Sequence, residues 1–439
     1  MANKQTAPRR VIIIGGGFAG LECARKLAND KRFEVILLDR TNHHLFQPLL
    51  YQVATASLAA PDIARSIRQI LSDAKNVTVL MDEVVSISPK EKCLTGKSGE
   101  VFKFDYLILA AGARTGYFGN DQWEEHSLGL KSLADAQNIR RRILSNLERA
   151  ELTKDEAERK RLMTIAIVGG GPTGVELAGA CVDLIHRSLK SNFRRIDTSK
   201  LRVILIENSP TILEHFAPHQ SVYAKQRLID LGVEVRNQTR VTDVQKGKLL
   251  FQDGTLLEAE AIVWAAGIAA NPLTKDLGVE MDRGGRVTPN LDLSVPGHPD
   301  IFVAGDLTNM RDRDEKFVPG VAPAATQMGD HIAKVLKEEL RLEGTRFADS
   351  KHSLRPQFRY NDKGMMAIIG KNAAVMKAGK FTMNGFFAWI AWLLIHILFL
   401  IGFRNKLSVL LGWAYAYIRN NPEARIIVYP SASGKEPRF

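Results

Sequence analysis

One glycine-rich loop occurs twice in this chain, and this repetition limits what the chain can fold into more than any other feature. Residues 15–24 read GGGFAGLECA and residues 169–178 read GGGPTGVELA. An apolar run precedes each loop, at 10–14 and 164–168, and a helical pattern follows it. A G-x-G-x-x-G loop between a strand and a helix is typical of dinucleotide-binding units. An internal repeat of such a unit predicts an α/β protein with two nucleotide-binding domains.

Each glycine of such a loop has its own task. The first allows the tight turn, the second lets the backbone approach a pyrophosphate, and the third lets helix and strand pack closely. The following helix presents free N–H groups and its positive dipole end to the phosphates. The candidate phosphate-binding residues are therefore Gly15, Gly17, Phe18, Ala19 and Gly20 in the first loop, and Gly169, Gly171 and Gly174 in the second.

An acidic residue ends the second strand of each repeat. Asp39 lies nineteen residues after Gly20, and Glu207 lies thirty-three residues after Gly174, because a polar insertion lengthens the second repeat. A carboxylate in this place accepts the ribose hydroxyls of an adenosine. It also repels a 2′-phosphate, and no Arg directly follows Glu207. The second repeat is therefore predicted to prefer NADH over NADPH.

Composition and charge exclude several classes of function. The three cysteines, Cys23, Cys93 and Cys181, are far apart and form no CxxC or metal-spaced cluster, so we expect free thiols and no metal site. The net charge of +12 indicates an anionic ligand, an anionic membrane surface or nucleic acid. No groove-reading motif supports nucleic acid, and no apolar segment before the first strand indicates a signal peptide.

A long apolar run lies near the C-terminus. Residues 385–403 are nineteen in number, and His396 is their one clearly polar side chain, so the run reaches the length needed to cross a bilayer. Trp389, Trp392 and Trp413 fall in this region, and six Arg or Lys against two Glu follow from residue 404 onward, which suits an interface with anionic headgroups. Three interpretations stay open: an interfacial helix pair, which we favour, a spanning helix, and a protein–protein interface.

Taken together, the motifs resemble the type II NADH dehydrogenases, the single-subunit NADH:quinone oxidoreductases of the pyridine-nucleotide flavoprotein superfamily. The glycine loops and the strands LILAAGA, VWAAGI and FVAGD are typical of the superfamily. The segments FQPLLYQVA at 46–54, VPGVAPAATQMG at 318–329, FRYNDKGMMAIIG at 358–370 and HILFLIGFRN at 396–405 narrow the match. The resemblance implies hydride transfer from NADH to FAD, then transfer of two electrons to a membrane quinone, without proton pumping.

The same resemblance assigns FAD to the first repeat. FAD would lie on the first loop with Asp39 at its adenosine ribose, and Asp306 and Ala324 would approach its isoalloxazine end. The further residues implied at this cofactor are Arg40, Gln47, Val84, Ala111 and Gly112.

NADH would lie on the second loop, with Glu207 at its ribose and Ala266 and Gly267 close by. Glu176 would lie near nicotinamide and flavin and is our candidate acid–base residue; the alternative is a carboxylate that only favours the helix N-terminus. Gln327 would face the quinone, although Pro323 replaces a Gln that many members have there.

Two adjacent histidines follow Asp39. For His43 and His44 we favour ordinary loop polarity over contact with the flavin or a role in proton transfer.

The expected organisation has five segments. They are an FAD-binding segment at 8–125, a connecting helical segment at 126–163, an NADH-binding domain at 164–289, a second FAD-binding segment at 290–380, and C-terminal membrane-anchoring helices and tail at 381–439. We expect a homodimer bound peripherally to the cytoplasmic face of the cell membrane. Which quinone is used stays open.

Related enzyme classes are less compatible with the sequence. Disulfide reductases and sulfide:quinone oxidoreductases need a reactive cysteine pair, which the three scattered cysteines do not provide. Reductases of soluble redox proteins do not need the apolar C-terminal region. A redox sensor that binds both nucleotides without turnover is the rival from another class.

Overall fold

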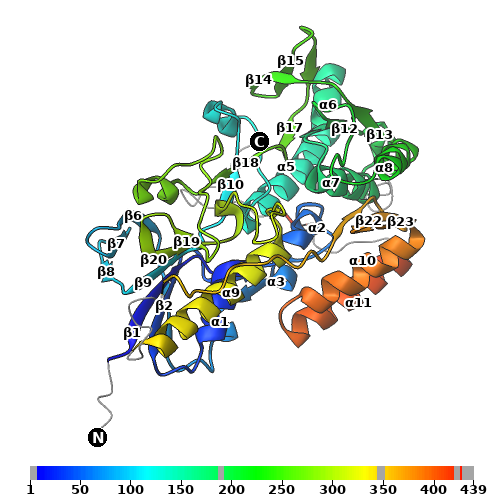
Figure 1. Ribbon diagram of the computed structural model, residues 1–439. Helices are drawn as coiled ribbons and strands as arrows, with labels where there is room; N and C mark the ends of the chain where they lie inside the picture. Colours follow the sequence, from blue (N-terminus) through cyan, green and yellow to red (C-terminus); the bar gives the residue numbers. More distant parts are fainter. Residues whose placement is uncertain (1–6, 186–191, 344–351, 420–425, 428–439) are drawn as a thin grey trace, which may run out of the picture. The chain divides into compact units, whose positions relative to one another are not determined.

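The computed structural model describes residues 7–185, 192–343, 352–419 and 426–427 of the chain. The chain forms two compact units (Figure 1). The first comprises residues 1–44, 65–114 and 268–363, and the second comprises residues 45–64, 115–267 and 364–439. Each unit is therefore assembled from segments far apart in sequence.

A mostly parallel six-stranded sheet forms the centre of the first unit, in the order β19-β20-β9-β1-β2-β5. The four neighbouring pairs from β20 to β5 are parallel, whereas β19 pairs antiparallel with β20. The strands are β1 (Arg9–Ile14), β2 (Phe33–Asp39), β5 (Val77–Met81), β9 (Tyr106–Leu109), β19 (Ser294–Val295) and β20 (His298–Val303). The predicted α/β fold with a parallel sheet is confirmed.

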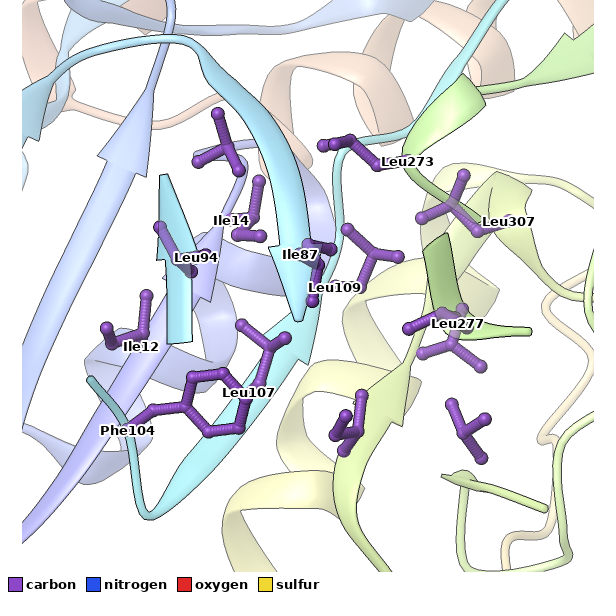
Figure 2. Packing of buried hydrophobic residues seen from close by; sticks show 14 of the residues in the cluster. Ile12, Ile14, Ile87, Leu94, Phe104, Leu107, Leu109, Leu273, Leu277 and Leu307 are labelled. Carbon is purple, nitrogen blue, oxygen red and sulfur yellow. The ribbon is translucent and has the colours of Figure 1, made fainter. Parts of the chain in front are cut away.

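One face of this sheet is buried by an apolar cluster (Figure 2). Ile12 and Ile14 of β1 and Leu107 and Leu109 of β9 share this cluster with the small antiparallel sheet β6-β7-β8 and the 3-10 helix η5. The covering elements are β6 (Val84–Ser88), β7 (Cys93–Gly96), β8 (Val101–Lys103) and η5 (Pro272–Leu277). Side chains alternate along a strand, so Ile13 faces the other way, toward Gly20 of α1.

Helix α1 (Phe18–Leu27) packs closely on α9 (Ala322–Leu342). A Cβ at Gly329 of α9 would lie 2.1 Å from the carbonyl oxygen of Ala19, so only glycine permits this approach. The unit also contains α4 (Ile67–Ile70) and the 3-10 helix η6 (Gly305–Leu307). The first turn of α1 therefore lies in close contact with α9 at Gly329.

A four-stranded parallel sheet in the order β13-β12-β11-β17 forms the centre of the second unit. Its strands are β11 (Thr164–Val168), β12 (Arg202–Ile206), β13 (Val233–Arg236) and β17 (Ala261–Trp264). The accompanying elements are α5 (Leu133–Leu152), α6 (Glu156–Leu162), α7 (Pro172–Asp183), α8 (Pro218–Leu231), the 3-10 helices η2 (Asp121–Glu125) and η4 (Thr198–Lys200), and the antiparallel strands β14 (Val241–Gln245), β15 (Lys248–Phe251) and β16 (Leu256–Glu258). The predicted repeat is thus present as a second parallel sheet.

The C-terminal region belongs to the second unit. It forms the antiparallel sheet β21 (Met365–Ile368), β22 (Ala374–Ala378) and β23 (Phe381–Gly385), followed by α10 (Phe386–Phe399) and α11 (Phe403–Arg419). Helices α10 and α11 lie side by side (Figure 1). Near the start of α11, Asn405 and Ser408 donate hydrogen bonds to Pro61 and Asp62 of the short helix α3 (Ala60–Ile63).

The nineteen-residue apolar run is split between two helices. Helix α10 has 14 residues and ends before Leu400, and α11 begins at Phe403. Among the residues that the structure describes, no helix is both long enough and apolar enough to cross a bilayer. The basic tail beyond residue 419 falls largely outside the described part.

The remaining elements are short. They are β3 (His43–Leu45), η1 (Gln47–Leu49), α2 (Leu50–Ala54), β4 (Ala64–Ser66), β10 (Ala113–Thr115) and β18 (Ile268–Ala270). The division into units differs from the segments expected from sequence. Residues 268–289 group with the first unit, and residues 364–380 and the expected connecting segment 126–163 group with the second.

Candidate functional site

The first glycine loop joins β1 to α1. Gly15 has a φ of +102°, and a Cβ there would lie 2.3 Å from the carbonyl oxygen of Ala110. A Cβ at Gly20 would lie 1.9 Å from the carbonyl oxygen of Gly15, whereas a Cβ at Gly17 would meet nothing within 4 Å. The outer glycines are therefore required by the protein's own packing, and the middle one faces open space at the helix N-terminus.

The second loop joins β11 to α7 and repeats this geometry. Gly169 has a φ of +113°, and its Cβ would lie 2.7 Å from the backbone nitrogen of Ala266. A Cβ at Gly174 would lie 1.9 Å from the carbonyl oxygen of Gly169, and Gly171 again faces open space. Pro172 begins α7, where a missing N–H costs nothing.

In the first unit, Asp39 closes the loop. Its Oδ2 accepts a hydrogen bond of 2.6 Å from the backbone N–H of Gly16, and its Oδ1 accepts bonds from the N–H and hydroxyl of Thr41. The carboxylate at the end of β2 therefore fixes the loop that follows β1.

Glu207 does the same in the second unit. Its Oε2 accepts a hydrogen bond of 2.5 Å from the backbone N–H of Gly170, and its Oε1 accepts one of 2.7 Å from Ser209. Each carboxylate oxygen has further acceptor capacity. The two acids thus hold matching places in the two units, although their spacings in sequence differ.

Other predicted FAD residues are found in the first unit. Ala111 and Gly112 follow β9, and the backbone of Ala111 lies against Gly15. Asp306 lies in η6, Ala324 is buried in the first turns of α9, Val84 is buried at the start of β6, and Arg40 is exposed. Phe18 and Ala19 begin α1.

Gln327 lies on α9, and both polar atoms of its side-chain amide are hydrogen-bonded to the backbone. Its Nε2 donates a hydrogen bond of 3.0 Å to the carbonyl oxygen of Asn361, and its Oε1 accepts one of 2.8 Å from the N–H of the same residue. Pro323 lies in the first turn of the helix, where a proline is well tolerated.

Gln47, Ala266 and Gly267 belong to the second unit. Gln47 is exposed and donates a hydrogen bond to the carbonyl oxygen of Lys131. Ala266 and Gly267 follow β17, and the backbone of Ala266 lies against Gly169, as the backbone of Ala111 lies against Gly15.

Glu176 lies on α7, beyond its first turn, which contains no acidic residue. A helix-dipole explanation is weak there because the effect fades within the first turn. Its Oε1 accepts a hydrogen bond of 3.3 Å from the backbone N–H of Ile368 in β21. Although the residue is partly exposed, surrounding protein desolvates the carboxyl and raises its pKa to about 8.

His44 corrects the sequence interpretation, which favoured ordinary loop polarity. The ring is buried, its Nδ1 lies 2.9 Å from the carbonyl oxygen of Gly16, and it meets Phe18 edge to face at 5.1 Å. The ring therefore packs against the first glycine loop and supports it through Gly16 and Phe18. His43 is partly exposed beside Asn42.

Sequence reasoning missed Gln52, and it grouped Trp392 with side chains suited to a membrane interface, whereas the structure buries this indole. Trp392 is fully buried among aromatic rings, and the side chain of Gln52 accepts a hydrogen bond from the indole of Trp413. A polar residue between Tyr51 and Val53 in an otherwise apolar helix was the available signal.

Comparison with protein families places residues 9–329 in the pyridine nucleotide-disulphide oxidoreductase family. Two proteins of Mycobacterium tuberculosis named type II NADH:quinone oxidoreductase, Ndh and NdhA, are 41% and 42% identical to the chain. Each alignment covers 93% of this chain, and 88% and 87% of the relatives. The solved structure of NDH2 from Plasmodium falciparum in complex with NADH has a TM-score of 0.85 at 20% identity and covers 94% of this chain and 99% of its own.

The raised pKa of Glu176 predicts a pH-dependent stability. Above its ordinary pKa the unfolded chain loses a proton that the folded protein keeps, so the carboxyl lowers stability progressively from about pH 4.5 to about pH 8 and constantly above that. Glu176→Gln removes this effect while keeping an acceptor for Ile368. We expect the variant to be more stable than the wild type by about 5 kcal/mol at pH 9 and equally stable at pH 4.

Urea unfolding of the FAD-loaded protein at several pH values measures this difference. Glu148→Gln, a change at an exposed position of α5, controls for the loss of one surface carboxylate. A constant difference between Glu176→Gln and the wild type across the pH range would contradict the expectation.

Proposed function

Because the chain belongs to the pyridine nucleotide-disulphide oxidoreductase family and, within it, to the type II NADH:quinone oxidoreductases, we propose that its first loop holds FAD and its second loop holds NADH. The enzyme oxidises NADH and reduces a quinone, with FAD as its cofactor. The main support for assigning a dinucleotide to each loop is that the same geometry occurs twice. In both loops an acidic side chain accepts a hydrogen bond from the loop backbone.

The fit of the two nucleotides rests on the loops themselves. In each, the middle glycine leaves open space directly before a helix N-terminus, where a Cβ would otherwise intrude. Free backbone N–H groups and the helix dipole favour a pyrophosphate there. Bound FAD supplies the two-electron chemistry between NADH and quinone. The chain's own residues bind, orient and exchange protons.

We assign Asp39 to the adenosine ribose of FAD and Glu207 to that of NADH. Each carboxylate is already held by its own loop, so its remaining lone pairs are presented in a fixed direction. The further FAD residues stay as the resemblance implies: Phe18, Ala19, Arg40, Gln47, Val84, Ala111, Gly112, Asp306 and Ala324. His44 is added as a support for the first loop.

Glu176 is the proposed proton carrier. A carboxyl with a pKa of about 8 is largely protonated at neutral pH, so it has a proton to donate to a quinone that has received electrons. The N–H of Ile368 holds the carboxyl in place. Gln327 stays proposed at the quinone, and its bonds to Asn361 favour a role in shaping the pocket over direct binding.

We further propose that α10 and α11 bind the membrane surface as an interfacial pair. Both helices expose large apolar side chains, including Phe387, Leu394, Leu398, Phe399, Phe403, Leu407, Leu410 and Leu411. Arg404 and Lys406 lie among them and suit anionic headgroups. A soluble protein seldom exposes such a continuous apolar surface without a partner. The cytoplasmic face and a homodimer stay predictions.

Steady-state oxidation of NADH and NADPH, with and without a short-chain quinone, tests the function. We expect fast, quinone-dependent oxidation of NADH, and a loss of about 10²-fold in kcat for Glu176→Gln with FAD content unchanged, because one acid–base group is removed. Wild-type turnover in this variant would refute the role of Glu176. Flavin reduction without quinone turnover would point to a sensor or a protein acceptor.

The preference for NADH is tested at Glu207. Glu207→Gln removes the charge that repels a 2′-phosphate and weakens the bond to the ribose, while Gln still accepts from Gly170. We expect the ratio of kcat/KM for NADH to that for NADPH to fall about tenfold or more. Asp39→Asn is the matched change in the first loop: it should lower FAD retention and leave this ratio unaltered. If the NADH-to-NADPH ratio of kcat/KM is unaltered in Glu207→Gln, Glu207 does not bind the ribose of NADH.

Membrane binding is tested without disturbing the packed face of α10. Leu394→Gln combined with Leu398→Gln alters side chains that are 60% and 69% exposed. Co-sedimentation with anionic vesicles should fall about tenfold or more, because apolar burial in the bilayer is lost. Val222→Gln with Leu256→Gln, on α8 and β16, changes apolar side chains elsewhere that are 67% and 50% exposed, and this variant should bind as the wild type does. Equal loss in both pairs would contradict the proposal.

A further inference from the structure

Phe118, in the second unit, holds a backbone conformation that its side chain does not favour. Residues 117–120, with the sequence Tyr-Phe-Gly-Asn, form a tight turn that is closed by a hydrogen bond of 3.0 Å from the N–H of Asn120 to the carbonyl oxygen of Tyr117. The two central residues, Phe118 and Gly119, have φ angles of +53° and +90°. Positive φ at both central positions is typical of a type I′ turn, which asparagine and glycine favour and a bulky aromatic residue does not.

The ring of Phe118 is exposed, although the aromatic rings beside it are buried. Phe118 is 73% exposed, whereas Tyr117 and Trp264 are 2% and 3% exposed. Those two rings pack at 5.6 Å within the apolar cluster of this unit, and Phe118 meets Trp264 edge on at 6.4 Å. The turn thus buries Tyr117 and directs Phe118 outward. Burial of its own ring therefore does not explain why this residue occupies a strained position.

Hydrogen bonds to β17 and to the loop after it fix the start of the turn. The indole N–H of Trp264 donates a bond of 3.0 Å to the carbonyl oxygen of Gly116. The N–H of Gly116 donates one of 3.4 Å to the carbonyl oxygen of Gly267. The residue two places before Phe118 is therefore held through both of its backbone polar groups, and this determines where the turn places the ring.

The ring lies against the backbone beside the second glycine loop. A Cβ at Gly267 would lie 2.7 Å from Cζ and 3.1 Å from Cε1 of Phe118. The preceding residue, Ala266, has its backbone against Gly169 of that loop. Gly112 is the matching residue of the first unit, and a Cβ there would meet nothing within 4 Å among the described residues. Phe118 thus distinguishes the surroundings of the second loop from those of the first.

The order of the strands indicates which half of a dinucleotide would pass this ring. In the sheet β13-β12-β11-β17, the loop follows β11, with β12 on one side and β17 on the other. Glu207, assigned to the adenosine ribose, follows β12, whereas Phe118 contacts Trp264 and Gly267 at the end of β17. With the pyrophosphate at the loop between them, the adenosine lies on the β12 side, and the nicotinamide half extends to the β17 side.

We propose that Phe118 is a binding residue for the nicotinamide half of NADH, and that contact between its ring and this half is the reason for the strained turn. The inference rests on the proposed binding of NADH at the second loop. An uncharged aromatic ring offers an apolar surface to the nicotinamide and its ribose, and the clamped turn holds that surface in place before the ligand arrives. The contact supplies affinity, while FAD and NADH supply the redox chemistry.

Phe118→Gly tests the inference in the FAD-loaded enzyme, because it removes the ring and the backbone strain together. The urea midpoint should not fall, since relief of strain offsets the greater freedom of glycine in the unfolded chain. KM for NADH should rise about tenfold with kcat within about twofold of the wild type, because the lost contact is made equally in the ground state and the transition state. A lower urea midpoint with KM unaltered would show a purely structural role and overturn the inference.

Two further variants separate the ring from the backbone. Glu315→Gly makes the same backbone change at an exposed residue of the first unit with a φ of +58°, and it should leave KM for NADH unaltered. Phe118→Tyr keeps an aromatic ring and should retain the wild-type KM within about twofold. An equal rise in KM in Glu315→Gly or in Phe118→Tyr contradicts the inference. A fall in KM in Phe118→Gly does so too, because the ring would then obstruct the site.

Inhibition of NADH oxidation by NAD⁺ and by ADP identifies the half of the ligand that the ring contacts. Phe118→Gly should raise the inhibition constant of NAD⁺ about tenfold and leave that of ADP, which lacks the nicotinamide and its ribose, within about twofold. Glu207→Gln should raise both constants. If Phe118→Gly alters neither constant, or both equally, while Glu207→Gln raises both, the inference fails and the binding of NADH at the second loop stands. If neither variant alters either constant, the proposed assignment of NADH to this loop fails, and the inference fails with it.

Discussion

The same contact occurs in both nucleotide-binding units. A carboxylate that follows or ends the second strand accepts a hydrogen bond from the backbone N–H of the second glycine in the Gly-Gly-Gly run. Asp39 holds Gly16 and Glu207 holds Gly170 in this way. The contact bridges two neighbouring parallel strands at their carboxyl ends, so it fixes the loop, the start of the helix and the direction of the remaining carboxylate lone pairs together. Under the proposed assignment of FAD and NADH to the two loops, phosphate binding and ribose recognition both depend on this contact, which occurs once in each unit.

The second unit extends this plan with the C-terminal sheet. The helix that begins at the second glycine loop also carries Glu176, Gly179 and Asp183 on the face where β21 and Gly370 dock. One helix therefore carries the second glycine loop at its N-terminus and contacts the C-terminal sheet along its side. Burial of the carboxyl raises the pKa of Glu176 to about 8, and the hydrogen bond from Ile368 of the C-terminal sheet opposes that shift.

Local patterns predicted the parts of the site whose causes are local. The glycines, the two acids and the Ala-Gly pairs after β9 and β17 all lie where their motifs indicated, because turn geometry and strand order determine them. The limits of the domains were harder to predict from the sequence. Residues 268–289 read as a continuation of the second repeat, yet Leu273, Leu277 and Val287 complete the apolar cluster on the sheet of the first unit. Burial over long sequence distances decided that assignment.

The sequence by itself determined two parallel α/β units, their loops and their acids, since each of these depends on residues within one strand–turn–helix segment. Tertiary structure alone decided the surroundings of Glu176 and the hydrogen bonds of Gln327 to Asn361. It also decided the burial of His44 and of Trp392. Each of these environments is built by segments apart in the chain: His44 contacts Gly16, 28 residues before it, and Glu176 contacts Ile368, 192 residues after it. Desolvation and hydrogen-bond partnering are properties of such assembled surroundings, and a residue's neighbours in sequence do not specify them.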